Sequence, residues 1–387
     1  MSTEYRNTGR IHELDALRGI AALGVVFWHY GAHFDAHPLA GILHPFYNAG
    51  FLLVDFFFVL SGYVIGRAYW NRKRQWHLFR NIWARVARLF PLHLLTLLIT
   101  AALVITLPIS ANDTDFNQPA NDLKHFVLNL LLLNQAGFQD GWSFNTPAWS
   151  ISTEFIVNVG FLAFISWSLT ARLVGTILLA VVGAVLLVLI RPAVLDGQTA
   201  FGFLDVNLLR CALGFSAGVF AYLLLERFDG ARRLTASPRI ADLIGASALI
   251  AMTSLMIASG RHPPIRDYLI SIAIALSCVI FIPFSATLKV LLCRRWLVFL
   301  GDISYSTYLV HYPIQLALYS ASMHGLARMD YTSPMLLLGY LVAVICIAAI
   351  THKYVELPCQ ARFLAISANH RAGLSKPSQG AMNVPPE

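Results

Sequence analysis

Residues 14–30 read LDALRGIAALGVVFWHY and are apolar except for Asp15, Arg18 and His29. Arg18 and His29 are eleven residues apart, which is about three helical turns. In a helix, both side chains therefore lie on one face, about 16 Å apart along the axis. Asp15, three residues before Arg18, shares that face. Because charged groups in a membrane helix point toward protein or water, this stretch predicts a membrane helix with a functional polar face.

The whole chain has the composition of a multi-pass membrane protein. Of its 387 residues, 57% are hydrophobic and 12% are charged, and the mean hydropathy is +0.63. Soluble proteins carry about 25% charged residues. The net charge of +8 is explained by Lys and Arg in cytoplasmic loops, so it does not indicate a nucleic-acid partner. The five cysteines include no CxxC pair, so we expect neither disulfides nor a zinc site.

Hydrophobic runs predict an all-α integral membrane protein with about ten transmembrane helices. These are expected at residues 14–34, 48–68, 89–108, 147–168, 173–190, 204–225, 241–259, 267–288, 297–320 and 334–352. The apolar run at 123–133 is too short to cross a core of about 30 Å and is predicted to be interfacial or re-entrant. We expect a cytoplasmic lead at 1–13, a ten-helix domain at 14–363 and a disordered tail at 364–387.

Basic residues alternate between successive loops. They are densest between residues 67 and 88, and they are sparse after the first, third, fifth and ninth predicted helices. Arg261 and Arg266 are the exception to this alternation. Since cytoplasmic loops carry the excess of Lys and Arg, both termini are predicted to be cytoplasmic.

This topology, with a rise of about 1.5 Å per residue, predicts two layers of polar side chains. The inner layer is basic and suits phosphate oxygens; it holds Arg18, Arg80, Arg85 and Arg88. The outer layer combines imidazoles and carboxylates that suit acid–base chemistry; it holds His29, Asp55, Glu154, Arg210 and His311. A phosphate-rich donor bound from inside and an acceptor bound nearer the outside would use both layers.

Structural roles are the alternative for these residues. Arg18 could snorkel to the interface, and His29 could make only an interhelical hydrogen bond. Charge that sets topology would also account for Arg85 and Arg88.

Other polar groups have structural alternatives too. Asp55 and Glu154 could pair with Arg210 or a histidine. The loop residues His33, His37 and His44 are predicted to be solvated, and their spacing does not indicate a metal site.

Several segments, taken together, resemble the membrane acyltransferase-3 family, and they occur in that family's order. They are the Arg18-x10-His29 spacing, VDFFFVLSGY at 54–63, RVARLFP at 85–91, PAWSISTE at 147–154, Arg210 with Gly214 and Gly218, SYSTYLVHYP at 304–313 and ELP at 356–358. One departure is Phe155, where many members carry a second acid. No extracytoplasmic hydrolase-like domain follows the predicted helices, so we expect the stand-alone form.

The resemblance implies an integral-membrane enzyme that moves an acyl group, usually acetyl, from cytoplasmic acyl-CoA. The acceptor is implied to be a hydroxyl of a cell-surface carbohydrate such as O-antigen or exopolysaccharide, although some members act on macrolide-type secondary metabolites. It implies no permanently bound cofactor. The implied partners are acyl-CoA, a carbohydrate or lipid-linked saccharide and membrane lipid, and the implied location is the bacterial inner membrane.

By the same resemblance, His29 is the catalytic base or acyl carrier, with Arg18, Glu154 and Asp55 as further catalytic residues. The implied donor- or substrate-binding residues are Asp15, Ser61, Arg85, Arg88, Trp149, Ser152, Arg210, Tyr305 and His311. Two alternatives remain open: a transporter of a glycan or small anion that uses the same groups as a relay, and a structural partner in a polysaccharide-export complex.

Overall fold

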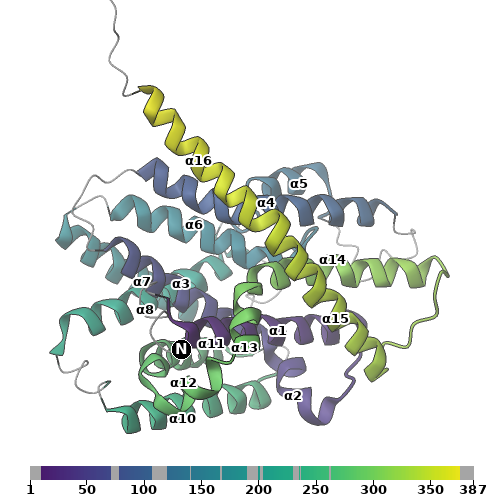
Figure 1. Ribbon diagram of the computed structural model, residues 1–387, viewed down its shortest axis with the longest axis horizontal. Helices are drawn as coiled ribbons and strands as arrows, with labels where there is room; N and C mark the ends of the chain where they lie inside the picture. The colour runs from purple at the N-terminus through teal and green to yellow at the C-terminus, as the bar shows by residue number, and fades with distance from the viewer. Residues whose placement is uncertain are drawn as a thin grey trace, which may run out of the picture.

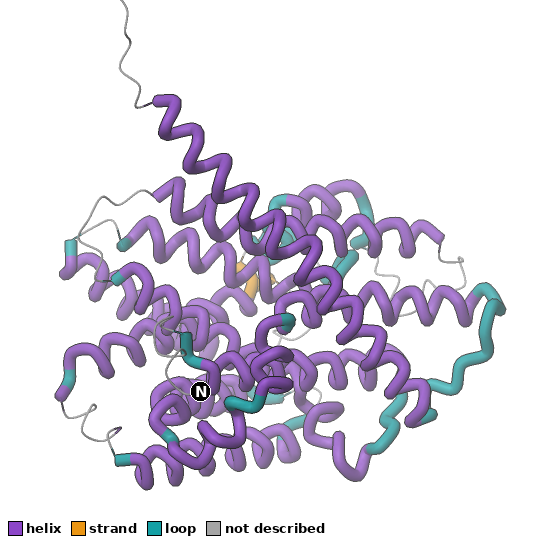
Figure 2. Tube along the Cα trace, in the orientation of Figure 1, coloured by secondary structure: helices purple, strands orange, loops and turns teal. Residues whose placement is uncertain are grey.

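The computed structural model describes residues 10–70, 78–106, 120–139, 141–165, 168–189, 199–200, 204–229, 235, 237–260 and 263–374. Helices dominate this part of the chain, and Figure 2 shows little else apart from connecting loops. The two strands, β1 (Thr199–Ala200) and β2 (Leu204–Asp205), form one short antiparallel pair. The expectation of an all-helical membrane protein is therefore confirmed at the level of its architecture.

The helices follow one another as labelled in Figure 1. The first half of the chain contains α1 (His12–Phe34), α2 (Ala40–Ala49), η2 (Gly50–Leu53), α3 (Val54–Tyr69), α4 (Leu78–Thr106), α5 (Leu123–Leu130), η4 (Thr146–Ala148), α6 (Trp149–Phe164) and α7 (Leu169–Leu189). The second half contains α8 (Val206–Arg227), α10 (Pro238–Ala258), α11 (Ile265–Phe281), η5 (Ile282–Phe284), α12 (Ala286–Leu292), α13 (Arg295–Asp302), α14 (Ser304–Met323), α15 (Pro334–Thr351), η6 (His352–Glu356) and α16 (Leu357–Leu374).

Every segment predicted to cross the membrane is largely helical over its described residues, but several boundaries differ. The segment 267–288, for example, is divided among α11, η5 and α12. The helix α4 begins at Leu78 rather than at 89. The segment 297–320 is two helices, because α13 ends at Asp302 and α14 begins at Ser304. The last predicted helix continues through the π-helical η6 into α16, which passes residue 363 and ends at Leu374.

Seven helical segments within the described ranges are long and apolar enough to cross a membrane. They are 40–69, 78–106, 172–189, 206–227, 238–258, 265–284 and 334–365. Neither α1 nor α14 is among the seven, although they have 23 and 20 residues. These two helices carry much of the candidate site, and their polar side chains lower their hydropathy.

The centre of the molecule is built on the close packing of α3 and α8. A Cβ atom on Gly62 would lie 1.9 Å from the carbonyl oxygen of Phe215, and one on Gly218 would lie 1.9 Å from that of Val59. Only glycine allows these backbones to approach so closely, as in other small-residue helix interfaces of membrane proteins. This contact fixes the face of α3 that carries Ser61.

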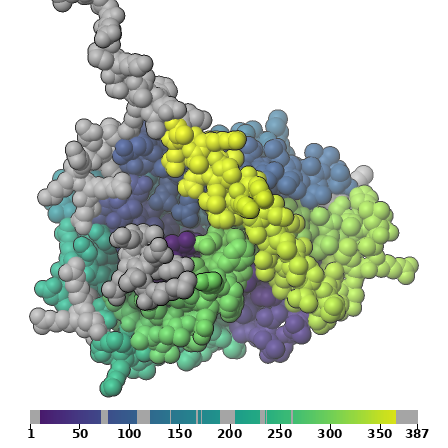
Figure 3. All heavy atoms as spheres, viewed as in Figure 1, coloured from purple at the N-terminus to yellow at the C-terminus, as the bar shows by residue number. Residues whose placement is uncertain are grey.

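Other helices lie at the periphery. The segments 172–189, 238–258 and 334–365 are mostly exposed in the isolated chain, as expected for helices that face lipid. In Figure 3, α16 (yellow) lies across the visible face of the molecule. There α16 packs on α4, where Trp83 Nε1 donates a 2.9 Å hydrogen bond to the carbonyl oxygen of Phe363.

Pro313 lies inside α14, and a side chain from another segment replaces the backbone hydrogen bond that this proline cannot make. A proline has no N–H to donate to the carbonyl four residues earlier, which here belongs to Leu309. The Nδ2 of Asn145 donates a 3.1 Å hydrogen bond to that carbonyl. The segment before α6 is thereby attached to α14, two residues before His311.

Some predictions concern residues outside the described ranges. These are most of the polar lead (1–9), the end of the tail (375–387) and the basic residues Arg72, Lys73 and Arg74.

Candidate active site

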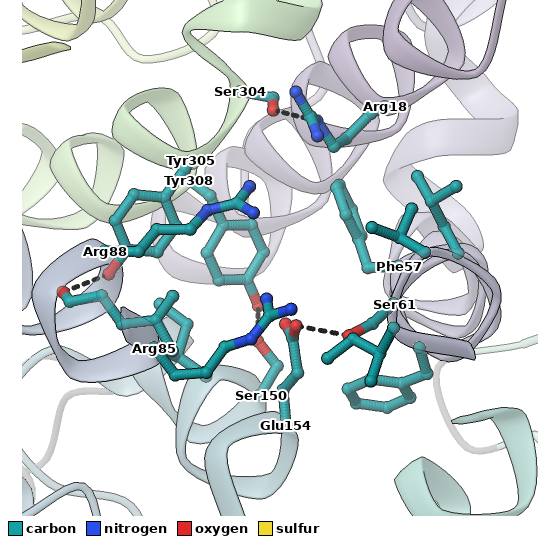
Figure 4. A pocket seen from close by; sticks show the side chains of 16 residues that line it. Arg18, Phe57, Ser61, Arg85, Arg88, Ser150, Glu154, Ser304, Tyr305 and Tyr308 are labelled. Carbon is teal, nitrogen blue, oxygen red and sulfur yellow. Dashed lines mark hydrogen bonds between the residues drawn. The ribbon is translucent and has the colours of Figure 1, made fainter. Parts of the chain in front are cut away.

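A pocket opens between α1, α3, α4, α6 and α14 (Figure 4). Its walls combine arginines, one carboxylate, hydroxyl groups and apolar side chains: Arg18, Phe57, Phe58, Leu60, Ser61, Val64, Ile65, Arg85, Arg88, Leu89, Ser150, Ile151, Glu154, Ser304, Tyr305 and Tyr308. Six of the residues singled out from the sequence meet here, namely Arg18, Ser61, Arg85, Arg88, Glu154 and Tyr305. Five separate helices bring them together, which no sequence-local motif could specify.

Arg18 is held at the junction of α13 and α14. One terminal nitrogen donates a 2.7 Å hydrogen bond to the carbonyl of Gly301, and Nε donates one of 2.8 Å to Ser304 Oγ. A terminal nitrogen also lies 3.4 Å from Asp15 Oδ1. A Cβ atom on Gly301 would lie 2.1 Å from the backbone oxygen of Asp15. Glycine at 301 therefore lets α1 and α13 touch, and that contact places the Arg18 guanidinium.

Asp15 pairs with two arginines, Arg10 and Arg18, at this end of α1. Arg10 Nε lies 2.5 Å from Asp15 Oδ2, and Arg10 also pairs with Asp302. Asp15 does not line the pocket. Its position supports Arg18 rather than a direct contact with a ligand.

Arg85 and Arg88 project into the pocket from the first third of α4. Figure 4 shows the Arg85 guanidinium directed toward the Glu154 carboxylate. Tyr305 anchors α14 to this helix, because its hydroxyl donates a 2.5 Å hydrogen bond to the carbonyl of Leu89. Arg80, which the sequence placed in the same basic layer, is exposed and does not line the pocket.

Glu154 lies with the arginines and not in the predicted outer layer. Its Oε1 accepts a 2.6 Å hydrogen bond from Ser61 Oγ. The preceding residues Asn145 and Pro147 are already buried, so α6 begins inside the protein.

His29 lies outside the pocket, in a cluster of three histidines that we call the histidine cluster: His29, His33 and His311. The ring of His29 lies 5.1 Å from that of His33 and 5.1 Å from that of His311, centroid to centroid. Both His29 and His311 are buried. Arg18 and His29 both contact α14, so the prediction that they share one face of α1 is confirmed.

His33 was predicted to be solvated, and that prediction is wrong. Its ring is half-buried and stacks on His29, and its Nδ1 lies 3.0 Å from Gln315 Oε1. His33 follows His29 by four residues, a spacing that places the two side chains on one helical face; this was the available sequence signal. His37 and His44 are exposed, as predicted.

Asp55 and Arg210 form a buried ion pair. Arg210 Nε donates a 2.6 Å hydrogen bond to Asp55 Oδ1, and a terminal nitrogen donates one of 3.0 Å to the carbonyl of Phe51. The guanidinium carbon lies 4.3 Å from the centre of the Tyr268 ring and 5.8 Å from that of Trp149. Neither charged residue lines the pocket, so the alternative of a structural pair fits Asp55 and Arg210, and Trp149 packs near the Arg210 guanidinium.

Ser152 also faces away from the pocket. It donates a 2.8 Å hydrogen bond to the carbonyl of Leu132 and accepts one of 3.1 Å from the backbone N–H of Gln135. Leu132 has a φ of 56°, an uncommon conformation for a branched side chain. Ser152 therefore holds a turn in the segment that precedes α6.

Three polar pocket residues, Ser150, Ser304 and Tyr308, were not singled out from the sequence as site residues. Tyr308 follows Ser304 by four residues and Tyr305 by three, and these spacings bring its side chain close to both along the helix; this was the available signal. Among the described residues, no group of three or more His, Cys, Asp or Glu side chains has the geometry of a metal site.

Comparison with known proteins gives the family. The chain is 32% identical over 185 residues to "Protein 2 in picA locus" of Rhizobium radiobacter, which covers 45% of this chain and 91% of that protein. It is 31% identical over 152 residues to "Acyltransferase MdmB" of Streptomyces mycarofaciens, covering 38% of this chain and 37% of that protein. No solved structure matches it. The acyltransferase-3 profile, described as an acyltransferase domain, matches residues 11–353, and the chain therefore belongs to the acyltransferase-3 family of membrane acyltransferases.

Proposed function

We propose that this protein transfers an acyl group, acetyl by default, from cytoplasmic acyl-CoA to a hydroxyl of a cell-surface carbohydrate such as O-antigen or exopolysaccharide. The observation that carries this proposal is the arrangement of the site. An arginine-lined pocket and a buried histidine lie along the same pair of helices, α1 and α14.

The pocket supports donor binding. Guanidinium groups donate two parallel hydrogen bonds to phosphate oxygens, and Arg18, Arg85 and Arg88 converge from two helices. Apolar side chains such as Leu60 and Ile65 line the rest of the pocket. A ligand with phosphates at one end and an uncharged chain at the other fits a pocket that has arginines in one part and apolar side chains in the rest.

The histidine cluster supports the chemical step. His29 takes the proton of the acceptor hydroxyl while the hydroxyl oxygen attacks the thioester carbonyl carbon. The C–S bond breaks, and the sulfur of CoA takes the proton from the imidazolium. The products are an ester and a free thiol, so no other reactant is needed. The reacting carbonyl reaches His29 if the donor extends about 16 Å from Arg18 along α1.

The membrane arrangement completes the proposal. Ten helices cross the bacterial inner membrane with both termini in the cytoplasm, as the distribution of Lys and Arg favours. The arginine end of the pocket then faces the cytoplasm, where acyl-CoA is available, and the histidine cluster lies in the outer half. The enzyme needs no permanently bound cofactor, because acyl-CoA itself supplies the acyl group. Membrane lipid contacts the helices that are exposed in the isolated chain.

Label transfer in inside-out membrane vesicles tests this function. Vesicles containing the parent, His29→Ala or His44→Ala receive acetyl-CoA that is radiolabelled in the acetyl group. His44 is an exposed histidine on α2 and serves as the matched control. We expect labelled saccharide from the parent and from His44→Ala and none from His29→Ala. Equal label with His29→Ala would exclude the catalytic role, and movement of a solute without acyl-CoA would favour a transporter.

A further inference from the structure

The first three residues of α14 each hold a different neighbouring element. Ser304 Oγ accepts a 2.8 Å hydrogen bond from Arg18 Nε of α1. The hydroxyl of Tyr305 donates one of 2.5 Å to the carbonyl of Leu89, which follows Arg88 on α4. Both Ser304 and Tyr305 line the arginine-lined pocket. The start of α14 therefore fixes two arginine-bearing helices relative to each other.

Ser306 holds the third element, and it does so from behind the pocket wall. Its side chain is buried, does not line the pocket, and donates a 3.0 Å hydrogen bond to Glu356 Oε2. Glu356 is 6% exposed and is the last residue of η6. The same carboxylate oxygen lies 2.9 Å from His352 Nδ1. Glu356 thus joins η6 to the first turn of α14.

The helix around Glu356 is irregular, and its sequence is poor in acids. Glu356 is the only acidic residue between positions 334 and 374. The π-helical η6 interrupts the regular helix between α15 and α16 at this point. Such turns are rare and occur frequently at functional sites. A buried carboxylate is unfavourable unless it is hydrogen-bonded, and here Ser306 and His352 supply the hydrogen bonds.

From these contacts we infer that Glu356 is a positioning residue for donor binding. Through Ser306 it fixes the rotation of the first turn of α14. That turn holds Arg18 directly, and it holds the backbone next to Arg88 through the Leu89 carbonyl. Because hydrogen bonds require narrow ranges of distance and angle, a rotated turn would loosen both arginines. The inference rests on the proposed function and deepens it, since it names a residue outside the pocket that sets the affinity for acyl-CoA.

Steady-state kinetics with acetyl-CoA test this role in inside-out vesicles that contain the full-length protein. Glu356→Ala and Ser306→Ala remove the same hydrogen bond from its two ends. Each should raise KM for acetyl-CoA about fivefold or more, with kcat within about twofold of the parent. The double variant should have the KM of Glu356→Ala, because the two substitutions act on one contact. Glu356→Gln keeps an oxygen that accepts from Ser306, so its KM should return to within about twofold of the parent.

Ser259→Ala is the matched control for Ser306→Ala. Ser259 is also buried and donates a 2.7 Å hydrogen bond to a buried carboxylate, that of Asp267. This pair joins the end of α10 to α11, and neither helix contributes to the arginine-lined pocket. Ser259→Ala should therefore lower the unfolding temperature as Ser306→Ala does, while its KM stays at the parental value. A general loss of stability reduces the amount of active enzyme but not its affinity for the donor, so KM separates positioning from packing.

The outcomes separate the two claims. A parental KM in folded Ser306→Ala and Glu356→Ala would overturn the positioning role and leave the enzyme function intact. An equal rise in KM with Ser259→Ala would also overturn it. Ser306→Ala removes only one oxygen atom, so it decides the question if Glu356→Ala does not fold. If the parent transfers no acetyl group in membranes that contain the acceptor, the proposed function fails, and this inference fails with it.

Discussion

Arg210 Nε donates a 2.6 Å hydrogen bond to Asp55 Oδ1, and both side chains are buried where α3 and α8 meet. A buried charge that loses its partner is strongly unfavourable, whereas replacing both partners with apolar residues is often neutral. The pair therefore behaves as part of the packing between helices.

The first prediction concerns this pair. Asp55→Ala should lower the free energy of unfolding by about 3–5 kcal/mol, because it leaves the Arg210 charge buried and unpaired. The double variant Asp55→Leu with Arg210→Met should recover most of that loss. Thermal unfolding in detergent measures both. A stable Asp55→Ala protein without acyl transfer would instead favour a catalytic role for Asp55.

Glu154 should act on donor binding. Its carboxylate lies beside the Arg85 guanidinium and accepts a hydrogen bond from Ser61. Glu154→Gln removes the charge that orients this arginine, so KM for acyl-CoA should rise about tenfold with a smaller change in kcat. Steady-state kinetics over a range of acyl-CoA concentrations separate the two constants. A fall in kcat at constant KM would show that Glu154 takes part in the chemical step.

The glycine contacts between α3 and α8 predict a large difference between two similar substitutions. Gly218→Ala places a Cβ atom 1.9 Å from the Val59 carbonyl oxygen, so we expect a loss of about 3 kcal/mol. Gly339→Ala on α15 meets nothing within 4 Å and should be neutral or stabilise by up to about 1 kcal/mol. Unfolding temperatures of the two variants provide the comparison, and equal values would contradict this packing.

His33 should influence the rate although it is outside the pocket. It stacks on His29 and is held by Gln315, so His33→Ala should reduce acyl transfer about tenfold, or about 1.4 kcal/mol. His37→Ala, which alters an exposed histidine in the loop after α1, should leave the rate unchanged. If both variants retain the parental rate, His33 has no part in positioning His29.

Local sequence rules predict the helices and the shared face of Arg18 and His29, because helical periodicity alone determines them. The break between α13 and α14 was not predicted, and neither was the contact between Gly301 of α13 and the backbone of Asp15. Periodicity contains no information about which distant segment fills a given space.

The position of Glu154 among the arginines and the burial of His33 were missed for a related reason. Both depend on contacts between helices that are distant in the sequence. Asn145, in the segment before α6, is attached to α14 at the carbonyl that Pro313 frees. The sequence shows that Pro313 leaves a carbonyl without its helical donor, but it does not show that Asn145 supplies the replacement.

Donor binding to the purified protein tests most directly whether the arginine pocket holds the donor while His29 performs the transfer. The equilibrium binding of radiolabelled acetyl-CoA is compared for the parent, Arg88→Gln, Arg80→Gln and His29→Ala. Arg80 lies on the same helix as Arg88 but is exposed and outside the pocket, so it controls for loss of charge.

We expect Arg88→Gln to raise Kd at least about tenfold, since a charge-assisted hydrogen bond contributes about 1.5–3 kcal/mol. Arg80→Gln and His29→Ala should bind as tightly as the parent, although His29→Ala transfers nothing. Unchanged binding by Arg88→Gln, or loss of binding by His29→Ala, would contradict the separation of donor binding from acyl transfer.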